Sequence, residues 1–417
     1  MTVRIDSFDT AGPGDTDGLV AVLSAHDPAR IRRLALLVKT EGSAETNDFS
    51  RELASWRARE AVLAHGGGDL LERSVFLHST GAEGAMTPFG YLVVELDDAD
   101  DADGSDGSGA AEAVPVTDGA GAVAVTDDAE STGGEAAPAP RGAPGPAGTL
   151  CVGIGRSRRI RGSEIGSAEH VALAEQAVAE AVADAGLDPA DVALAVVKTP
   201  LTAHDEPMRV TSAEAKAVGA LGAALALGEV ERADVVPAAF GRDLTLHSRR
   251  TMVFSSSEAA CVEVLVFGNR PGAGGDLRIV SGLLADVLDA PGIRRVLAAA
   301  GAELTADGTV REPGQVAALL IKAGNRRDGT LRGARTTVLT SQLDPDKHVR
   351  AIMSGVAGAV LGTGRMFISA NSVHQAPDGG GLCVAIVGPP VSGAPATDVP
   401  PRGVPASVAA SPAGGAV

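Results

Sequence analysis

The feature that most constrains the fold is an internal repeat in which an apolar run ending in lysine occurs three times. The runs are LALLVK, LAVVK and ALLIK, and each is followed further along the chain by a second apolar run that ends in serine: VFLHS, TMVFS and RMFIS. In chain order these runs end at Lys39, Ser79, Lys198, Ser255, Lys322 and Ser369. A single lysine at the end of an apolar strand ordinarily marks only the point where the strand reaches water. Three in step with three serines predict three similar structural units.

Each unit shows the same order of elements. A strand and a helix rich in Ala and Leu precede the lysine run, and a helix led by a cation lies between the lysine run and the serine run. These cations are Arg51, Lys216 and Arg350. We therefore expect β-α-β-α-β units in an α/β (α+β) protein. Three similar repeats would surround a pseudo-threefold axis, with inner β-sheets forming a barrel-like core and helices outside.

Composition divides the 417 residues into three units and two further segments. Residues 98–148 are rich in Asp, Gly, Ala, Ser and Pro without apolar periodicity, as is typical of a disordered linker, and the tail 389–417 looks similar. The predicted units are residues 1–97, 149–272 and 273–388. The linker region also carries most of the net charge of −18. Because no positive stripe remains elsewhere, a nucleic-acid partner is not expected.

Three cysteines, Cys151, Cys261 and Cys383, are widely spaced and match no metal-binding pattern. We expect them to be reduced, as in a cytoplasmic protein. The first residues contain no apolar stretch, and no run approaches the roughly 20 apolar residues that a membrane helix needs. A membrane partner is therefore not expected either.

The pairing of serine with lysine points to nucleophilic catalysis. A serine hydroxyl needs an adjacent base, and a lysine can serve when burial and neighbouring cations lower its pKa. Three lysines and three further cations converging on one axis would meet that condition. They would also offer hydrogen-bond donors at three places around one small ring, which favours a flat cyclic imide or ureide as the ligand.

Three segments resemble the ring-opening amidohydrolases, the family of cyanuric acid hydrolases and barbiturases. KTEGSAETNDFSRELA, which begins at Lys39, resembles the pattern KTEGNG…ND.(S/T)R, and HSTGAEGAMTPFG, which contains Ser79, resembles SGGTEG.LSPH. ISANSVHQAPDGGG, which contains Ser369, resembles SGG.EHQGPDGGG. The resemblance extends over all three units and implies hydrolytic opening of a cyclic amide. It also implies a homo-oligomer, a homotetramer, that binds a small-molecule substrate.

Carried over by residue, the resemblance assigns catalysis to the second unit, with Ser255 as nucleophile and Lys198 as base. The other residues would bind substrate, either through side chains or through the backbone N–H that follows each serine. They are Lys39, Arg51, Ser79, Thr80, Lys216, Ser256, Lys322, Arg350, Ser369 and Ala370. Ser256 and Ser257 are alternative nucleophiles, but register with Ser79 and Ser369 favours Ser255.

No cofactor is expected for the chemistry, although the resemblance implies a structural Mg or Ca ion near His374 with Gln375 as a ligand. A loop closed by hydrogen bonds would explain these residues equally well. GIGR at residues 153–156 begins like a dinucleotide fingerprint but lacks its third glycine, so we interpret it as the end of a strand.

Three other functions stay open at this point. One is a non-hydrolytic binder or sensor of the same heterocycles, and another is an amidohydrolase for a different cyclic ureide or imide. A metal-dependent cyclic amidohydrolase is disfavoured, because the eight histidines are scattered without an HxH or HExxH pair.

Overall fold

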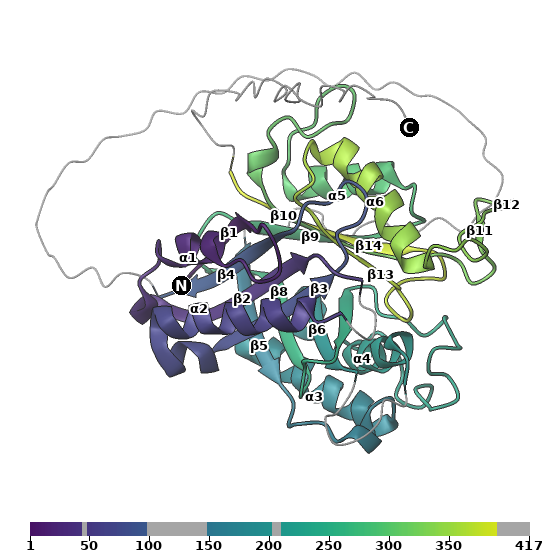
Figure 1. Ribbon diagram of the computed structural model, residues 1–417, viewed down its shortest axis with the longest axis horizontal. Helices are drawn as coiled ribbons and strands as arrows, with labels where there is room; N and C mark the ends of the chain where they lie inside the picture. Colours follow the sequence, from purple (N-terminus) through teal and green to yellow (C-terminus); the bar gives the residue numbers. More distant parts are fainter. Residues whose placement is uncertain (44–47, 98–147, 202–209, 390–417) are drawn as a thin grey trace, which may run out of the picture.

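The computed structural model describes residues 1–43, 48–97, 148–201 and 210–389, which form three units with the same order of elements (Figure 1). The first contains β1 (Thr2–Asp9), α1 (Asp17–Leu23), β2 (Ile31–Thr40), α2 (Ser50–Glu72), β3 (Ser74–Thr80) and β4 (Phe89–Leu96). The second contains β5 (Gly148–Arg156), α3 (Ala168–Ala185), β6 (Val192–Pro200), α4 (Ser212–Ala226), β7 (Thr251–Ser256) and β8 (Glu263–Pro271). The third contains β9 (Arg278–Leu284), α5 (Ala290–Ala300), β10 (Val316–Ala323), α6 (Pro345–Leu361), β13 (Phe367–Ala370) and β14 (Gly381–Val387).

A short hairpin, β11 (Thr330–Leu331) with β12 (Ala334–Arg335), is inserted in the third unit. Short 3-10 turns precede the lysine strands at Pro28–Arg30, Pro189–Asp191 and Pro313–Gln315, and another lies at Gly162–Glu164. Apart from the boundary residues Gly148 and Pro389, the acidic linker and the tail expected from composition lie outside the described residues.

Each unit has one strand more than the sequence analysis expected. The order is β-α-β-α-β-β, because β4, β8 and β14 follow the serine strands. These strands end in neither lysine nor serine, so the repeat that revealed the other strands gave no signal for them. The added strand lies inside the sheet rather than at its edge, and it pairs with the lysine strand on the side away from the serine strand.

The three four-stranded sheets share one topology. In each, the first strand pairs antiparallel with the fourth, the fourth antiparallel with the second, and the second parallel with the third. The lysine strand is always the second and the serine strand always the third, so both stand side by side in every unit. The repeat found in the sequence is thus a repeat of tertiary structure.

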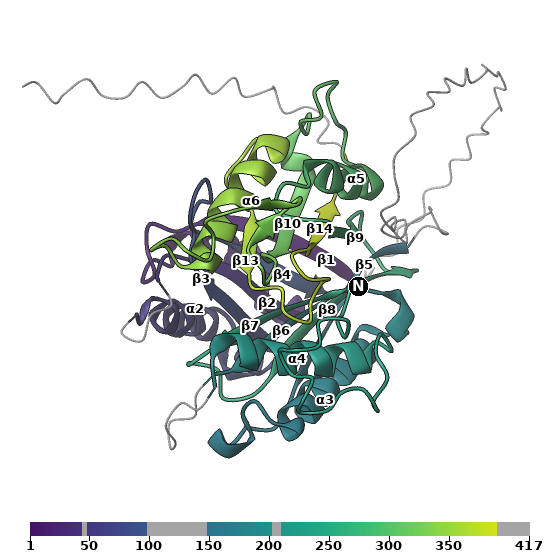
Figure 2. The same ribbon diagram turned by 90° about the vertical axis from the view of Figure 1, so that its right-hand side faces the viewer.

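The two faces of each sheet have different neighbours, as the alternation of side chains along a strand allows. Inner faces of all three sheets contribute to a single apolar cluster, which includes Leu37, Val196 and Leu320. Outer faces pack on the helices of their own unit: α1 and α2, α3 and α4, or α5 and α6 (Figure 2). The barrel-like core that we expected is a core shared by three sheets, which among the described residues form three separate ladders and not one closed barrel.

Small residues let the helices of the second unit lie very close to its sheet. A Cβ atom added at Gly153 of β5 would lie 2.1 Å from the carbonyl oxygen of Ala181 in α3. At Gly222 of α4 it would lie 2.4 Å from the carbonyl oxygen of Val171. GIGR is therefore the end of β5 packed against α3, as the sequence analysis interpreted it. No helix in the described ranges is long and apolar enough to cross a membrane.

Candidate active site

The three lysines of the repeat are buried on the inner faces of their sheets. Lys39 lies on β2, Lys198 on β6 and Lys322 on β10, and none is more than 1% exposed. Burial lowers the pKa of all three ammonium groups, and neighbouring cations lower it further. The pKa of Lys39 and the pKa of Lys322 are both lowered well below the ordinary value. Burial in the centre of the molecule therefore favours the neutral amine most strongly at Lys39 and Lys322.

Two of the lysines contact the serine of their own unit. Lys39 Nζ lies 3.1 Å from Ser79 Oγ and donates to the carbonyl oxygen of Thr80 at 2.9 Å. Lys322 Nζ lies 3.0 Å from Ser369 Oγ and donates to the carbonyl oxygen of Val253 at 2.8 Å. The parallel ladders explain both contacts, since Lys39 is the partner of Ser79 and Lys322 the partner of Ser369. Side chains at paired positions project from the same face.

The second unit departs from this pattern, and the expected contact between Ser255 and Lys198 is not formed. The ladder pairs Lys198 with Phe254 and pairs Ser255 with Thr199. Ser255 therefore projects toward the helices of its unit, and its Oγ lies 2.7 Å from the Oγ of Ser212 at the start of α4. The register assumed from the sequence is wrong by one residue, and a shift of one residue exchanges the faces of a strand.

Lys198 has a carboxylate partner instead of a serine. Its Nζ lies 2.6 Å from Glu258 Oε1 and donates to the carbonyl oxygen of Phe76 at 3.2 Å. Burial opposes ionisation of Glu258, but the charges of Lys198 and Arg51 outweigh it and lower the pKa of Glu258 to about 2. The same carboxylate counteracts the lowering of the pKa of Lys198. Lys198 is therefore held as an ammonium ion more firmly than the other two lysines.

A glutamate offset supports the corrected register independently. Glu83 stands four residues after Ser79, and Glu258 stands four residues after Phe254. Arg350 binds Glu83 through two guanidinium nitrogens, one at 2.7 Å, while Arg51 Nε donates to Glu258 at 2.9 Å. Both glutamates thus accept an arginine from another unit, which identifies Phe254 as the counterpart of Ser79.

The leading cations of the three helices therefore connect the units in a cycle. Arg51 of the first unit reaches the second and Arg350 of the third reaches the first. Lys216 of the second unit lies 3.9 Å from Asp346 of the third. The third unit has Val373 where the other two have glutamate, so within the described ranges Lys216 has no glutamate at that position and lies near Asp346 instead.

The remaining sequence-predicted residues lie at the ends of the serine strands. Thr80 and Ala370 are the last residues of β3 and β13 and are buried. Ser256 is buried with no hydrogen-bond partner for its hydroxyl within the described part of the chain, whereas Ser257 Oγ donates to Glu52. Sequence reasoning missed Glu83, Glu258 and Phe254, although the common spacing of the two glutamates could have revealed all three.

The residues around Gln375 do not fit a Mg or Ca site. The carboxamide oxygen of Gln375 accepts from the Val253 N–H at 2.7 Å, and its nitrogen donates to two backbone carbonyls. Both ring nitrogens of His374 are also bonded, to the backbone of Gly241 and Leu246. Within the described ranges no three His, Cys, Asp or Glu side chains gather as metal ligands, whereas Mg and Ca take about six or more oxygen ligands. These residues instead close a loop by hydrogen bonds.

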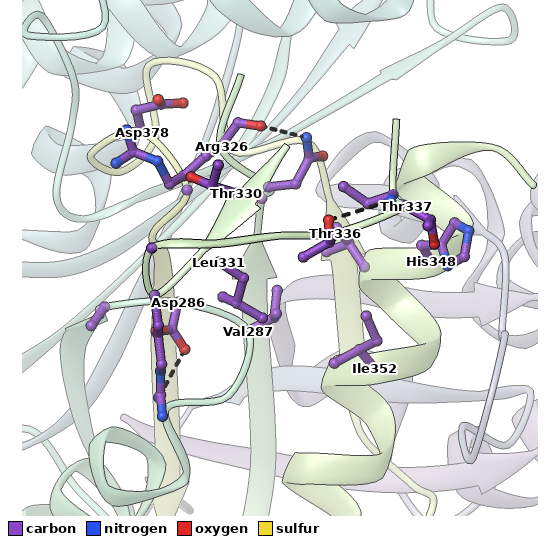
Figure 3. Close-up of a pocket in the computed structure, with 18 residues that line it drawn as sticks. Asp286, Val287, Arg326, Thr330, Leu331, Thr336, Thr337, His348, Ile352 and Asp378 are labelled. Carbon is purple, nitrogen blue, oxygen red and sulfur yellow. Dashed lines mark hydrogen bonds and ion pairs between the residues drawn. The ribbon is translucent and has the colours of Figure 1, made fainter. Parts of the chain in front are cut away.

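Two cavities open in the third unit. One of about 420 Å³ is lined by Asn325, just beyond Lys322, and by Asn371, just beyond Ser369, together with Asp346 at the start of α6. Residues of the second unit, including Glu214 and Phe240, complete its lining, whereas Lys322 and Ser369 themselves do not line it. The other, of about 460 Å³, lies between α6 and the β11–β12 hairpin (Figure 3). None of the sequence-predicted site residues lines it, and it shares Gly324, Asn325, Asp378 and Gly379 with the first cavity.

Fold and site together define a protein of three concatenated α/β units with buried serine–lysine pairs at their common centre. Comparison with known proteins identifies the family. The model of the amidohydrolase ring-opening proteins matches residues 4–120 and 135–388, and the chain belongs to this family.

Relatives of known name span almost the whole chain. A cyanuric acid amidohydrolase of Azorhizobium caulinodans is 32% identical over 402 residues, covering 92% of this chain and 97% of its own length. Barbiturase 1 of a Nocardioides species is 29% identical, with 85% and 90% covered. The crystal structure of the cyanuric acid hydrolase from A. caulinodans matches with a TM-score of 0.73 at 28% identity, covering 93% of this chain and 99% of that one.

Proposed function

We propose that the protein is a hydrolase that opens the ring of a cyclic amide, using Ser369 as nucleophile and Lys322 as base. The observation that carries this proposal is the 3.0 Å contact between Lys322 Nζ and Ser369 Oγ, buried beside other cations. Relatives named cyanuric acid amidohydrolase, cyclic amide hydrolase and barbiturase support the reaction class.

The reaction would proceed through an acyl-enzyme. Neutral Lys322 takes the proton of Ser369 as Oγ attacks a ring carbonyl, and in this scheme the backbone N–H of Ala370 donates to the oxyanion. When the ring C–N bond breaks, Lys322 returns the proton to the leaving nitrogen. A water molecule then attacks the ester and gives its proton to Lys322. Lys322 passes this proton to Ser369 Oγ as the ester C–O bond breaks, which releases the opened product and restores both side chains.

The electrostatic surroundings favour Lys322 and Lys39 over Lys198 as a base. Burial lowers the pKa of Lys322, three cations lower it further, and the carboxylate of Asp346 acts in the opposite direction. Lys39 has Glu83 near it, and Lys198 contacts Glu258 directly. Asn325 and Asn371, which follow Lys322 and Ser369 closely in the chain, line the 420 Å³ cavity, and this supports the third unit's pair over that of the first unit. In this scheme Lys39 and Ser79 bind a second ring carbonyl.

Trapping the acyl-enzyme tests the assignment. The ring loss of cyclic amides would be followed by ultraviolet absorbance, and quenched reactions would be analysed by peptide mass spectrometry. We expect an adduct on the peptide that contains Ser369. Ser369→Ala should lose at least about a thousandfold in kcat because it removes the attacking oxygen. Ser255→Ala, which changes a hydroxyl on the helix side of β7, is the matched control and should retain activity. An adduct on Ser255 or Ser79 would refute the assignment.

A non-hydrolytic binder of cyclic amides is the second candidate. The specific observation in its favour is that Phe254 stands where the first and third units have serine. If the protein bound such rings tightly but released no opened product at any pH, this second function would replace the first.

A further inference from the structure

Phe254 changes the shape and the chemistry of one third of the centre. Its ring centroid lies 5.3 Å from that of Phe367, and Lys322 Nζ lies 5.4 Å from the centroid of the Phe254 ring. Because Lys322 Nζ is also in contact with Ser369 Oγ, the phenyl ring stands beside the proposed catalytic pair. Phe254 is 3% exposed, so it is part of the inner wall and not of the surface.

The three corners of the centre therefore differ in what they offer a ligand. The first and third units each present a serine hydroxyl beside a lysine. The second presents a phenyl ring, and its lysine is turned to Glu258. A carbonyl oxygen placed against the phenyl ring would lose its hydrogen bonds to water and gain none. A phenyl group is also larger than a hydroxymethyl group, so this corner has less room.

We infer that Phe254 sets the specificity of the site for rings with two carbonyl groups and a hydrocarbon third corner. The class comprises dihydropyrimidinediones such as dihydrouracil, together with glutarimides and hydantoins. Each has an N–H between two carbonyls for the two serine–lysine corners, and methylene groups for the phenyl corner. Rings with three carbonyls, such as cyanuric acid and barbituric acid, fit worse. This inference rests on the proposed cyclic-amide function.

The inference is tested by measuring binding and turnover separately. Dihydrouracil, glutarimide, hydantoin, cyanuric acid and barbituric acid would each be titrated calorimetrically into the full-length protein, and ring opening would be followed chromatographically. The wild type should bind the best two-carbonyl ring at least about tenfold more tightly than either three-carbonyl ring, which is the effect of one unpaired polar group.

Matched variants separate the hydroxyl from the space. Phe254→Ser adds a hydroxyl group and also frees the volume of the phenyl ring, and it should improve cyanuric acid binding relative to hydantoin by about tenfold or more. Phe254→Ala supplies only the space and should bring a smaller change. Ser255→Ala changes the next residue of the same strand on its helix side and leaves the Phe254 ring in place, so it should keep the wild-type order of ligands. Thermal unfolding would verify that each variant is folded.

The possible failures have different signatures. Equal or tighter binding of the three-carbonyl rings by the wild type overturns the role of Phe254, whether or not any variant folds. An unchanged ligand ratio in a folded Phe254→Ser protein overturns it as well. Tight binding of two-carbonyl rings without ring opening would instead contradict the hydrolytic function and leave the specificity standing.

Discussion

At the scale of single residues, three lysines at equivalent positions of the repeat differ in pKa and in partner because their nearest neighbours differ. Lys198 Nζ has a carboxylate oxygen at 2.6 Å. Lys39 Nζ and Lys322 Nζ instead have a serine hydroxyl at 3.1 Å and 3.0 Å, and both are influenced by neighbouring cations. Burial disfavours the ammonium form of each, but only at Lys198 does a directly bonded carboxylate restore it. Glu258 therefore distinguishes Lys198 from the other two lysines.

The pH dependence of turnover should report the state of Lys322. Only the neutral amine can act as base, so kcat should rise with pH through the pKa of Lys322 and fall on the acid side. Since this pKa is well below the ordinary value, the acid limb should lie well below pH 10.4. Val373→Glu should place a carboxylate at the offset that Glu258 has in the second unit, stabilise the ammonium ion and move the limb to higher pH.

Val373→Gln is the control for this shift, since it has the same shape without the charge. Its pH profile should match that of the wild type. If both variants moved the limb equally, or neither did, the neighbouring carboxylate would not be what distinguishes the lysines.

At the scale of elements, β7 shows where reading the sequence reached its limit. The strand itself and its place beside β6 could be predicted from the repeat, and Lys39–Ser79 and Lys322–Ser369 followed correctly. The predicted contact between Ser255 and Lys198 was wrong because TMVFSSS contains three serines in a row, and apolar content alone does not show which residue faces inward. Packing decided it: Met252 and Phe254 join the common core, while Val253 packs with the helices of its unit.

Glu258, four residues beyond Phe254, should contribute measurably to stability. Its pKa is about 2 when folded and about 4.3 in an unfolded chain, so its stabilising effect is present above about pH 4.3 and is lost as pH falls toward 2. Glu258→Gln should lower the free energy of unfolding near pH 7 by about 3 kcal/mol, because Lys198 is left buried without its partner. Urea unfolding measures this loss.

The difference between Glu258→Gln and wild type should shrink when the titration is repeated from pH 4 toward pH 2. Glu60→Gln breaks only an exposed pair with Arg57 and should change stability by less than about 0.5 kcal/mol. A loss equal to that of Glu60→Gln would mean that the Lys198–Glu258 pair adds no net stability.

At the scale of the whole molecule, the fold is one core divided among three sheets. The number of units and the order of helices were predictable because each unit repeats the same sequence pattern. The closed barrel was not, since whether neighbouring sheets join edge to edge depends on side chains that the pattern does not specify. The fourth strand of each sheet was likewise hidden, because its ends carry no repeated residue.

The acidic segment between the first two units should be dispensable for folding and turnover. β4 and β5, which precede and follow it, each have a ladder within their own sheet. The segment's composition also lacks the apolar content to join a core. Replacing residues 98–147 by a glycine–serine linker should leave the melting temperature within a few degrees of the wild type and kcat within about twofold. An insoluble or inactive product would contradict this.

The cycle of contacts from unit to unit also has a consequence for the time at which the centre forms. Glu83 is synthesised long before Arg350, and Lys39 long before Phe367, whose ring lies 5.6 Å from its ammonium group. On the ribosome the first two units can build their own sheets, but the third sheet, which covers part of their inner faces, is complete only when β14 has emerged, because β14 lies between β9 and β10. A nascent or truncated chain thus keeps its lysines hydrated and protonated. Nucleophilic reactivity should appear only after the last fifth of the chain has been made.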